Sequence, residues 1–289
     1  MAVRDAGIYR WAAGRRSARA ILARAALYAI AALAALVMVF PFYWTVAGSF
    51  MTPVELFSSI PHLWPRNPTA DTYTRIWQLL PIGRWFVNSL VTSVVTMVVA
   101  VIVSSAAGYC FAQLRFVGRG FWFVLILATL MVPYQSRIIP LYMQLHGYGL
   151  SNSYLGIVLP GLANALGVFM MTQFFKTVPS ELRDAALMDG ASELRVFLQV
   201  YVPLARPAVA TLALLMFLTS WDQLLWPLII APQPDMRTLQ VGLANLNQTL
   251  PTMNYQMAAI ALSVIPVVIV FVLAQRQLIA GIAAGALKE

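Results

Sequence analysis

Long apolar runs, separated by shorter polar segments, make up most of the 289-residue chain. A helix needs about 20 mostly apolar residues to cross the hydrocarbon core of a bilayer. Six runs have this length, at about residues 25–50, 86–112, 121–142, 154–175, 207–230 and 257–279. They are continuous and lack the alternation of transmembrane strands, so they favour helices over a barrel. The pattern predicts an all-α, polytopic membrane protein with six transmembrane helices.

Two polar segments between the spans are long and rich in proline. We expect a short helix in each, near residues 73–80 after the first span and 239–246 after the fifth. Pro160 and Pro266 lie inside predicted spans. A proline removes a hydrogen bond from the helical ladder, so both are candidate kinks.

The basic residues place the ends of the spans on two sides of the membrane. Most of the 19 Lys and Arg lie before the first span, after the second and fourth, and at the C-terminal end. Cytoplasmic segments carry the excess of basic residues. We therefore expect both termini in the cytoplasm, with residues 1–24 as a basic cytoplasmic tail and residues 25–289 as a transmembrane domain of the cell membrane.

Composition supports the membrane assignment and narrows the chemistry. Hydrophobic residues make up 61% of the chain and charged residues 10%, against about 45–50% and 25% in soluble domains. The net charge of +9 comes from residues between apolar runs, so we expect lipid contact and no nucleic-acid binding. The one cysteine, Cys110, excludes an intrachain disulfide. No metal-ligand spacing and no phosphate-binding GxxxxGK[ST] loop is present, so we expect no catalytic residue, metal or cofactor in this chain.

The loop between the fourth and fifth spans, residues 176–206, is the most informative segment. Ser180 is placed to cap a first short helix, and Gly190 to end it, because glycine tolerates positive φ. Ser192 is placed to cap a second helix, which we expect Pro203 to end. The loop is also rich in carboxylates, at Glu181, Asp184, Asp189 and Glu193. Either this hairpin docks on a partner through its small and acidic residues, or it is a solvated linker.

The same loop resembles a known sequence motif. Asp184-Ala185-Ala186, then Gly190, then Val200-Tyr201-Val202-Pro203 is similar to the EAA motif of ABC-importer permeases, in which EAA, three residues, Gly, nine residues and I-x-L-P follow one another. The spacing matches throughout, with Asp for Glu at 184 and Val at 200 and 202. The resemblance implies an ABC importer permease fold with 176–206 as a cytoplasmic coupling loop.

The resemblance extends to other stretches of the chain. Asn88-Ser89, Trp226-Pro227-Leu228 and residues 275–281 (QRQLIAG) are similar to the carbohydrate-uptake class of these permeases. Residues 130–140 (LMVPYQSRIIP) and 221–230 (WDQLLWPLII) are similar to glycerol-3-phosphate permeases.

The resemblance also implies partner proteins, each with a separate task in transport. A second homologous permease subunit would complete the channel, and two ATPase subunits carrying ATP and Mg would dock on the loop. An extracytoplasmic solute-binding protein would deliver a sugar or related solute, or alternatively glycerol 3-phosphate or a glycerophosphodiester. The residues assigned to ATPase coupling are Glu181, Asp184, Ala185, Ala186, Asp189, Gly190 and Pro203.

Polar residues inside the spans are candidates for the solute pathway. Asp222 is the one acid within a predicted span, and an ionised carboxylate there is costly unless it faces protein or water. Trp221, Gln223 and Asn88 are the other candidates. The alternative for Asp222 is a structural hydrogen bond to a neighbouring helix. Arg137, near an outer end, either reaches the interface or meets an anionic solute or the binding protein.

Two other classes of membrane protein remain as rivals. An ion-coupled secondary transporter would need ionisable pairs within the membrane and internal repeats, and the sequence offers only Asp222. A membrane-embedded enzyme would need a catalytic dyad or metal ligands at membrane depth. Neither pattern occurs in the sequence.

Overall fold

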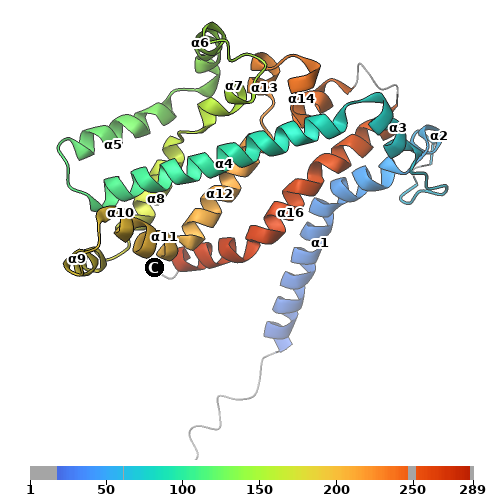
Figure 1. Ribbon diagram of the computed structural model, residues 1–289. Helices are drawn as coiled ribbons and strands as arrows, with labels where there is room; N and C mark the ends of the chain where they lie inside the picture. The colour runs from blue at the N-terminus through green and yellow to red at the C-terminus, as the bar shows by residue number, and fades with distance from the viewer. Residues whose placement is uncertain (1–17, 61, 247–251, 287–289) are drawn as a thin grey trace, which may run out of the picture.

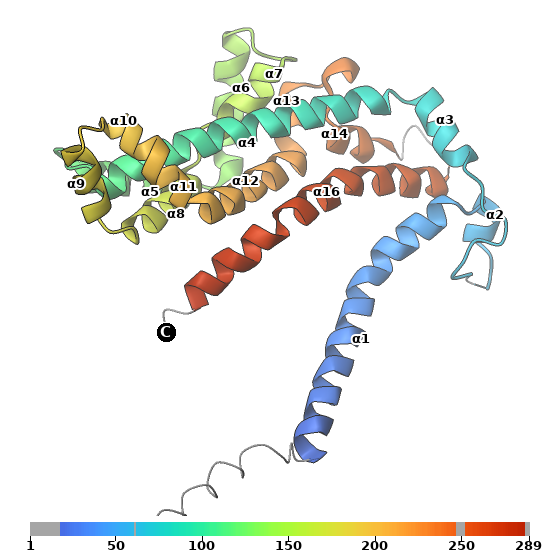
Figure 2. The same ribbon diagram turned by 60° about the horizontal axis from the view of Figure 1, so that its bottom comes forward.

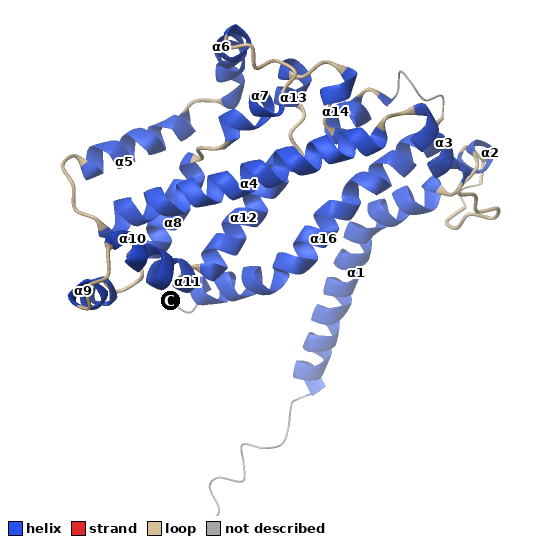
Figure 3. Cartoon of the chain, viewed as in Figure 1, coloured by secondary structure: helices blue, strands red, loops and turns tan. Residues whose placement is uncertain are grey.

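The computed structural model describes residues 18–60, 62–246 and 252–286, and within these ranges the chain forms helices and turns without a strand. Figure 3 shows the helices joined mostly by short loops. The all-α prediction is therefore confirmed for the described residues. The residues of the predicted basic tail before Ala18 lie outside them, and its last residues already belong to the first helix.

In the described part of the chain, three long helices are apolar enough to cross a membrane. They are α1 (Ala18–Ser49), α4 (Ile82–Gln113) and α16 (Met253–Ala286), which match the first, second and sixth predicted spans. α4 runs through the centre of the molecule and packs against α8 and α12 (Figure 1). α16 packs against α12 and α1.

The third predicted span, residues 121–142, is not a continuous helix. The chain forms α5 (Arg119–Ala128) and a 3-10 turn η1 (Thr129–Met131), and then α6 (Tyr134–Gly147) at 100° to them. The break occurs at Val132, whose backbone is extended. Pro133 follows it, and the residue before a proline is pushed out of the helical region.

The fourth and fifth predicted spans, residues 154–175 and 207–230, are also interrupted. The fourth consists of α7 (Tyr154–Val158), a 3-10 turn η2 (Leu159–Gly161) that contains Pro160, and α8 (Ala165–Lys176), with a bend of 44°. The fifth consists of α12 (Arg206–Trp221) and α13 (Leu225–Ile230). Counting each bent helix pair that passes the length and composition criteria as one span, the described residues hold three to six candidate spans, so six spans with cytoplasmic termini stays a prediction.

The short helices outside the spans are close to their predicted positions. α2 (Pro53–Leu56) and α3 (Asp71–Leu79) follow α1, and α14 (Leu239–Ala244) follows the 3-10 turn η4 (Pro234–Met236). α2 and α3 lie at one end of the molecule, and α14 lies along its upper edge (Figure 1). The predicted helices near 73–80 and 239–246 are thereby confirmed.

The hairpin of residues 176–206 lies at the opposite end. It contains α9 (Glu181–Met188), α10 (Glu193–Val196), a π-helical turn η3 (Phe197–Tyr201) and α11 (Val202–Leu204). α16 descends toward this end of the molecule, whereas the start of α1 diverges from the bundle (Figure 2). Side chains of α1 from Leu27 to Phe42 are exposed, because only its last turns pack on the rest of the chain.

Separate groups of buried side chains hold the two ends. Near α2 and α3, Trp85 of α4 packs with Phe217 and Trp221 of α12 and with residues of α16. At the hairpin end, Tyr109 of α4 packs with Phe175 of α8 and Tyr201 of η3. α4 belongs to both groups, so it connects the two ends through one continuous helix.

Candidate functional site

The hairpin has well-defined helix ends. α9 is closed by Gly190, whose φ is 82°. The Gly190 N–H donates to the carbonyl of Leu187 and the Ala191 N–H to that of Ala186, both at 3.0 Å, which is the Schellman arrangement. The Ser192 side chain accepts from the Arg195 N–H at 3.4 Å and caps α10. The predictions that Gly190 ends the first short helix and that Ser192 caps the second are confirmed.

Two other predicted helix signals in the hairpin were wrong. Ser180 makes no side-chain capping bond, because its own backbone is helical and its carbonyl accepts from the N–H groups of Arg183 and Asp184. Pro203 does not end the second helix, which continues to Leu204. It lies in α11, directly after the π-helical turn η3.

The hairpin presents its acids outward and its apolar residues inward. Glu181, Asp184, Ala185 and Asp189 are exposed, as is Met188, 88% of whose surface is accessible. On the other face of α9, Ala186 and Leu187 pack against the buried group around Tyr109. Most residues assigned to ATPase coupling are therefore accessible to a partner, whereas Ala186 holds α9 to the membrane helices.

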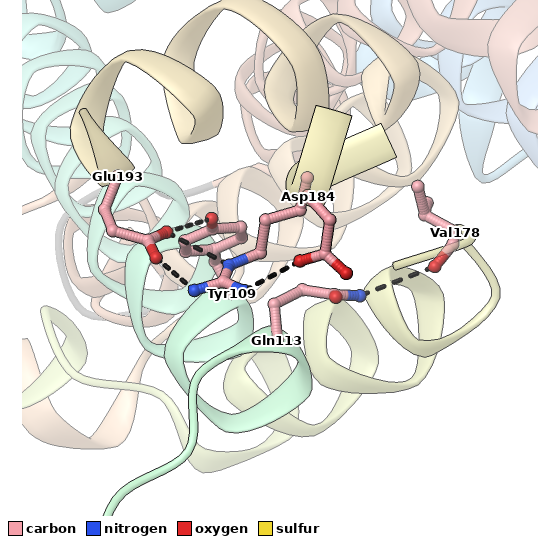
Figure 4. Close-up of polar contacts among 6 residues, drawn as sticks. Tyr109, Gln113, Val178, Asp184 and Glu193 are labelled. Carbon is pink, nitrogen blue, oxygen red and sulfur yellow. Dashed lines mark hydrogen bonds and ion pairs between the residues drawn. The ribbon is translucent and has the colours of Figure 1, made fainter. Parts of the chain in front are cut away.

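A charged clamp, consisting of Arg183, Glu193 and Tyr109, fixes the hairpin to α4 (Figure 4). Arg183 is ion-paired with Glu193 and, at 3.3 Å, with Asp184. The Tyr109 hydroxyl donates to Glu193 Oε2 at 2.8 Å. The sequence indicated the acids of the loop but not this clamp, since Tyr109 lies on a different span and no local spacing connects it to Glu193.

Electrostatics favour the charged forms of the clamp. The Arg183 guanidinium, which donates to Glu193, holds the pKa of that carboxyl below its usual value. The same contact raises the pKa of Arg183. Both groups therefore stay ionised near neutral pH. A second polar contact lies beside the clamp, where Gln113 Nε2 donates to the carbonyl of Phe175 at 2.7 Å.

A cavity of about 380 Å³ lies between the broken helices. Its walls come from α4, η1, α6, α7, η2, the residues at the start of α8, and α12. Its polar lining residues are Thr96, Thr129, Tyr134, Arg137, Asn164, Thr219, Ser220 and Gln223. The cavity exists because three predicted spans are interrupted here instead of packing as straight rods, and its volume is within the range of small-molecule sites.

Of the four residues predicted for the solute pathway, only Gln223 lines this cavity. Trp221 is 1% exposed and stacks on Phe217 in the core. Asn88 is also buried, where its amide donates to the carbonyls of Asp235 and Arg237, both at 2.9 Å. These contacts fasten the η4 turn to α4, so the structure gives Asn88 a structural position.

The fourth predicted pathway residue, Asp222, lies outside the cavity, whereas three residues that sequence reasoning missed line it. Asp222 is exposed at the end of α12, outside the cavity lining. Tyr134, Thr96 and Asn164 do line the cavity. No sequence pattern indicated that these residues line one cavity, because they come from separate segments and are uncharged. Among the described residues, no group of three or more His, Cys, Asp or Glu is placed to hold a metal ion.

Comparison with known protein families identifies the one to which this chain belongs. The profile of the family described as binding-protein-dependent transport system inner membrane component matches residues 104–283, which include the hairpin and most of the cavity lining. The chain belongs to this family. Its membrane location follows from the family and from the apolar helices.

Several characterised relatives resemble this inner membrane component along most of its length. The arabinooligosaccharides transport system permease protein AraQ of Halalkalibacterium halodurans is 35% identical, over 89% of this chain and 94% of the relative. The diacetylchitobiose uptake system permease protein NgcG of Streptomyces coelicolor is 31% identical, over 90% and 88%. The sn-glycerol-3-phosphate transport system permease protein UgpE of Brucella abortus (strain 2308) is also 31% identical, over 86% and 92%.

A solved structure agrees with the fold. A chain of a bacterial ABC transporter involved in the import of the acidic polysaccharide alginate superposes on the inner membrane component with a TM-score of 0.78. The match covers 91% of this chain and 99% of the other, at 23% sequence identity. The predicted permease fold is thereby confirmed.

Proposed function

We propose that this chain is a channel-forming permease subunit of an ATP-driven importer, which translocates a sugar or related solute delivered by an extracytoplasmic binding protein. The observation that carries the proposal is the exposed hairpin with Asp184-Ala185-Ala186 and Gly190 on a chain of the inner membrane component family. The relatives named for arabinooligosaccharides and diacetylchitobiose support a sugar as solute.

Glycerol 3-phosphate is the second candidate solute. UgpE, at 31% identity, is a permease of an sn-glycerol-3-phosphate transport system. The sequence resemblance at residues 130–140 and 221–230 points in the same direction.

The hairpin is suited to receive motion from a separate ATPase. Its outward face carries carboxylates and the small side chain of Ala185, so a partner surface can approach closely and offer basic groups. Its inward face is held by the ion pair of Arg183 with Glu193 and by the contact with Tyr109. A rigid hairpin can transmit displacement, and this hairpin contacts α4 and leads directly into α12. In our proposal, two ATPase subunits bind ATP and Mg, move the hairpins of this chain and a second permease, and thereby alternate access to the solute pathway.

Co-purification and two substitutions test this proposal. A second permease and an ATPase should co-purify with the chain, which an ion-coupled transporter or a membrane enzyme would not require. Gly190→Pro replaces a φ of 82° by one near −65°, and Ala185→Asp adds charge and bulk to the exposed face. Both should abolish uptake and uncouple ATPase activity while the protein still inserts into the membrane.

The matched control is Gly190→Asn, because asparagine tolerates positive φ better than other side chains. It should retain most of the uptake. Normal transport by Gly190→Pro and Ala185→Asp would refute the coupling role of the hairpin.

A further inference from the structure

Among the described residues, the lining of the cavity between the broken helices has a positively charged side chain and no negatively charged one. Arg137 of α6 lines it, whereas its other polar lining residues are hydroxyls and amides. No carboxylate is among the described lining residues. Asp222, adjacent in sequence to the lining residue Gln223, lies outside the lining, and no ion pair joins it to Arg137 in the described chain. The protein thus supplies a cation to the cavity without its counter-charge.

Arg137 is positioned by aromatic and amide neighbours. Its guanidinium carbon lies 6.0 Å from the centre of the Tyr134 ring, a distance at which a cation and an aromatic face attract each other. Gln223 Nε2 donates to the Tyr134 hydroxyl at 3.3 Å. This series of contacts connects α6 to the end of α12 and supports the ring on which the guanidinium rests, while the N–H groups of Arg137 make no hydrogen bond within the described chain.

We propose that the translocated solute carries an anionic group, either a carboxylate or a phosphate, which Arg137 binds in this cavity. The inference rests on the proposed importer function. Arg137 is exposed at the cavity, and its N–H groups have no partner within the described chain, so its guanidinium can form two parallel N–H···O bonds with a carboxylate or phosphate. The hydroxyls and amides of Thr129, Asn164 and Ser220 then remain for the uncharged part of the solute.

The first experiment determines the charge class of the solute. Thermal shifts of the cognate binding protein are measured with matched pairs: glycerol 3-phosphate and glycerol, galacturonate and galactose, and oligogalacturonides and neutral oligosaccharides of equal length. We expect the acidic member of one pair to stabilise the binding protein more than its neutral partner. The phosphate and uronate arms distinguish the two sources of charge. Stabilisation by neutral members alone, or by no acidic member, overturns the inference.

The second experiment tests Arg137 itself. The assembled transporter is reconstituted in liposomes, and uptake of the selected acid is measured for three variants. Arg137→Gln should lower uptake at least tenfold, and Arg137→Lys should lower it less, because lysine keeps the charge but not the paired N–H groups. Arg75→Gln, which removes an exposed arginine from α3 outside the lining, should leave uptake unchanged.

ATPase activity separates the two possible failures. If ATPase activity stimulated by the loaded binding protein persists in Arg137→Gln and uptake is also unchanged, Arg137 only reaches the lipid interface and the inference is overturned while the importer function stands. If no ATPase joins the complex at all, the proposed function fails.

Discussion

The helices are closely packed at the hairpin end of the molecule and leave a space between them in the cavity region, although α4 runs through both. At the hairpin end, α4 is in tight contact with α8, and large aromatic side chains fill the space between helices. Tyr109 lies 4.9 Å from Tyr201, measured between ring centres. Around the cavity, residues of broken helices leave about 380 Å³ unfilled. The first region is suited to transmit movement and the second to accommodate a solute.

This difference in packing density shows how one helix bundle can combine a tightly packed region with a cavity. Close packing makes a core sensitive to any added atom, so we expect the hairpin end to tolerate little change in side-chain volume. A polar cavity can adjust its side chains around a guest. The following substitutions test this contrast, beginning with the largest expected effect.

A glycine-to-alanine change in each of the two regions, the hairpin end and the cavity wall, measures how tightly each is packed. A Cβ at Gly108 would lie 2.6 Å from Met171 Cβ and 2.9 Å from the Met171 and Thr172 backbone. Because backbone cannot move aside, we expect Gly108→Ala to destabilise the protein by about 1–3 kcal/mol. A Cβ at Gly161 would meet only the side chain of Thr96, with its methyl group at 2.8 Å, and that side chain can shift into the cavity. Thermal unfolding in detergent compares the two.

Gly120→Ala is the control, since its Cβ would have no neighbour within 4 Å. The contrast holds if Gly108→Ala unfolds at a clearly lower temperature than Gly161→Ala and Gly120→Ala. Equal losses at Gly108 and Gly161 would mean that the cavity wall is as rigid as the hairpin end.

Removing the charge of Glu193 tests the clamp. Glu193→Gln keeps an oxygen for the Tyr109 hydroxyl but loses the ion pair with Arg183. The two side chains are 40% and 22% exposed, so water screens the pair and we expect a loss of about 1 kcal/mol at neutral pH. Unfolding is followed from neutral to acidic pH.

The direction of the pH effect follows from the lowered pKa of Glu193. The contribution of the pair is complete above the ordinary carboxyl pKa of 4.5 and is lost as the pH falls below it. The wild type and Glu193→Gln should therefore converge in stability in acid, while Asp189→Asn, which alters an exposed acid, should follow the wild type. A constant gap at every pH would contradict the ionic origin of the effect.

The smallest effect is expected at the cavity. Gln223→Ala removes one hydrogen bond to Tyr134, of length 3.3 Å, which is worth about 0.6 kcal/mol between membrane helices. Unfolding should hardly change, because the cavity leaves room for relaxation. Gln135→Ala, an exposed position on α6, is the control. A loss as large as that of Gly108→Ala would show that the cavity region is not adaptable.

The motifs that sequence predicted well are local. Gly190 ends α9 and Ser192 caps α10, because both act on backbone within a few residues. The apolar runs located α1, α4 and α16 for the same reason, since length and hydropathy are properties of one segment. Ser180 was misassigned as a cap because its outcome depended on its backbone conformation, which residue type alone does not specify.

The sequence by itself determined that this chain is a helical membrane protein with a small acidic hairpin, because apolar length and helix-end signals are read along one segment. Only the tertiary structure decided that Tyr109 meets Glu193, that Asn88 and Trp221 are buried outside the cavity lining, and that Arg137 faces a cavity. These contacts join residues far apart in the chain. They depend on where three helices break and how the pieces turn, and neighbouring helices decide that through packing.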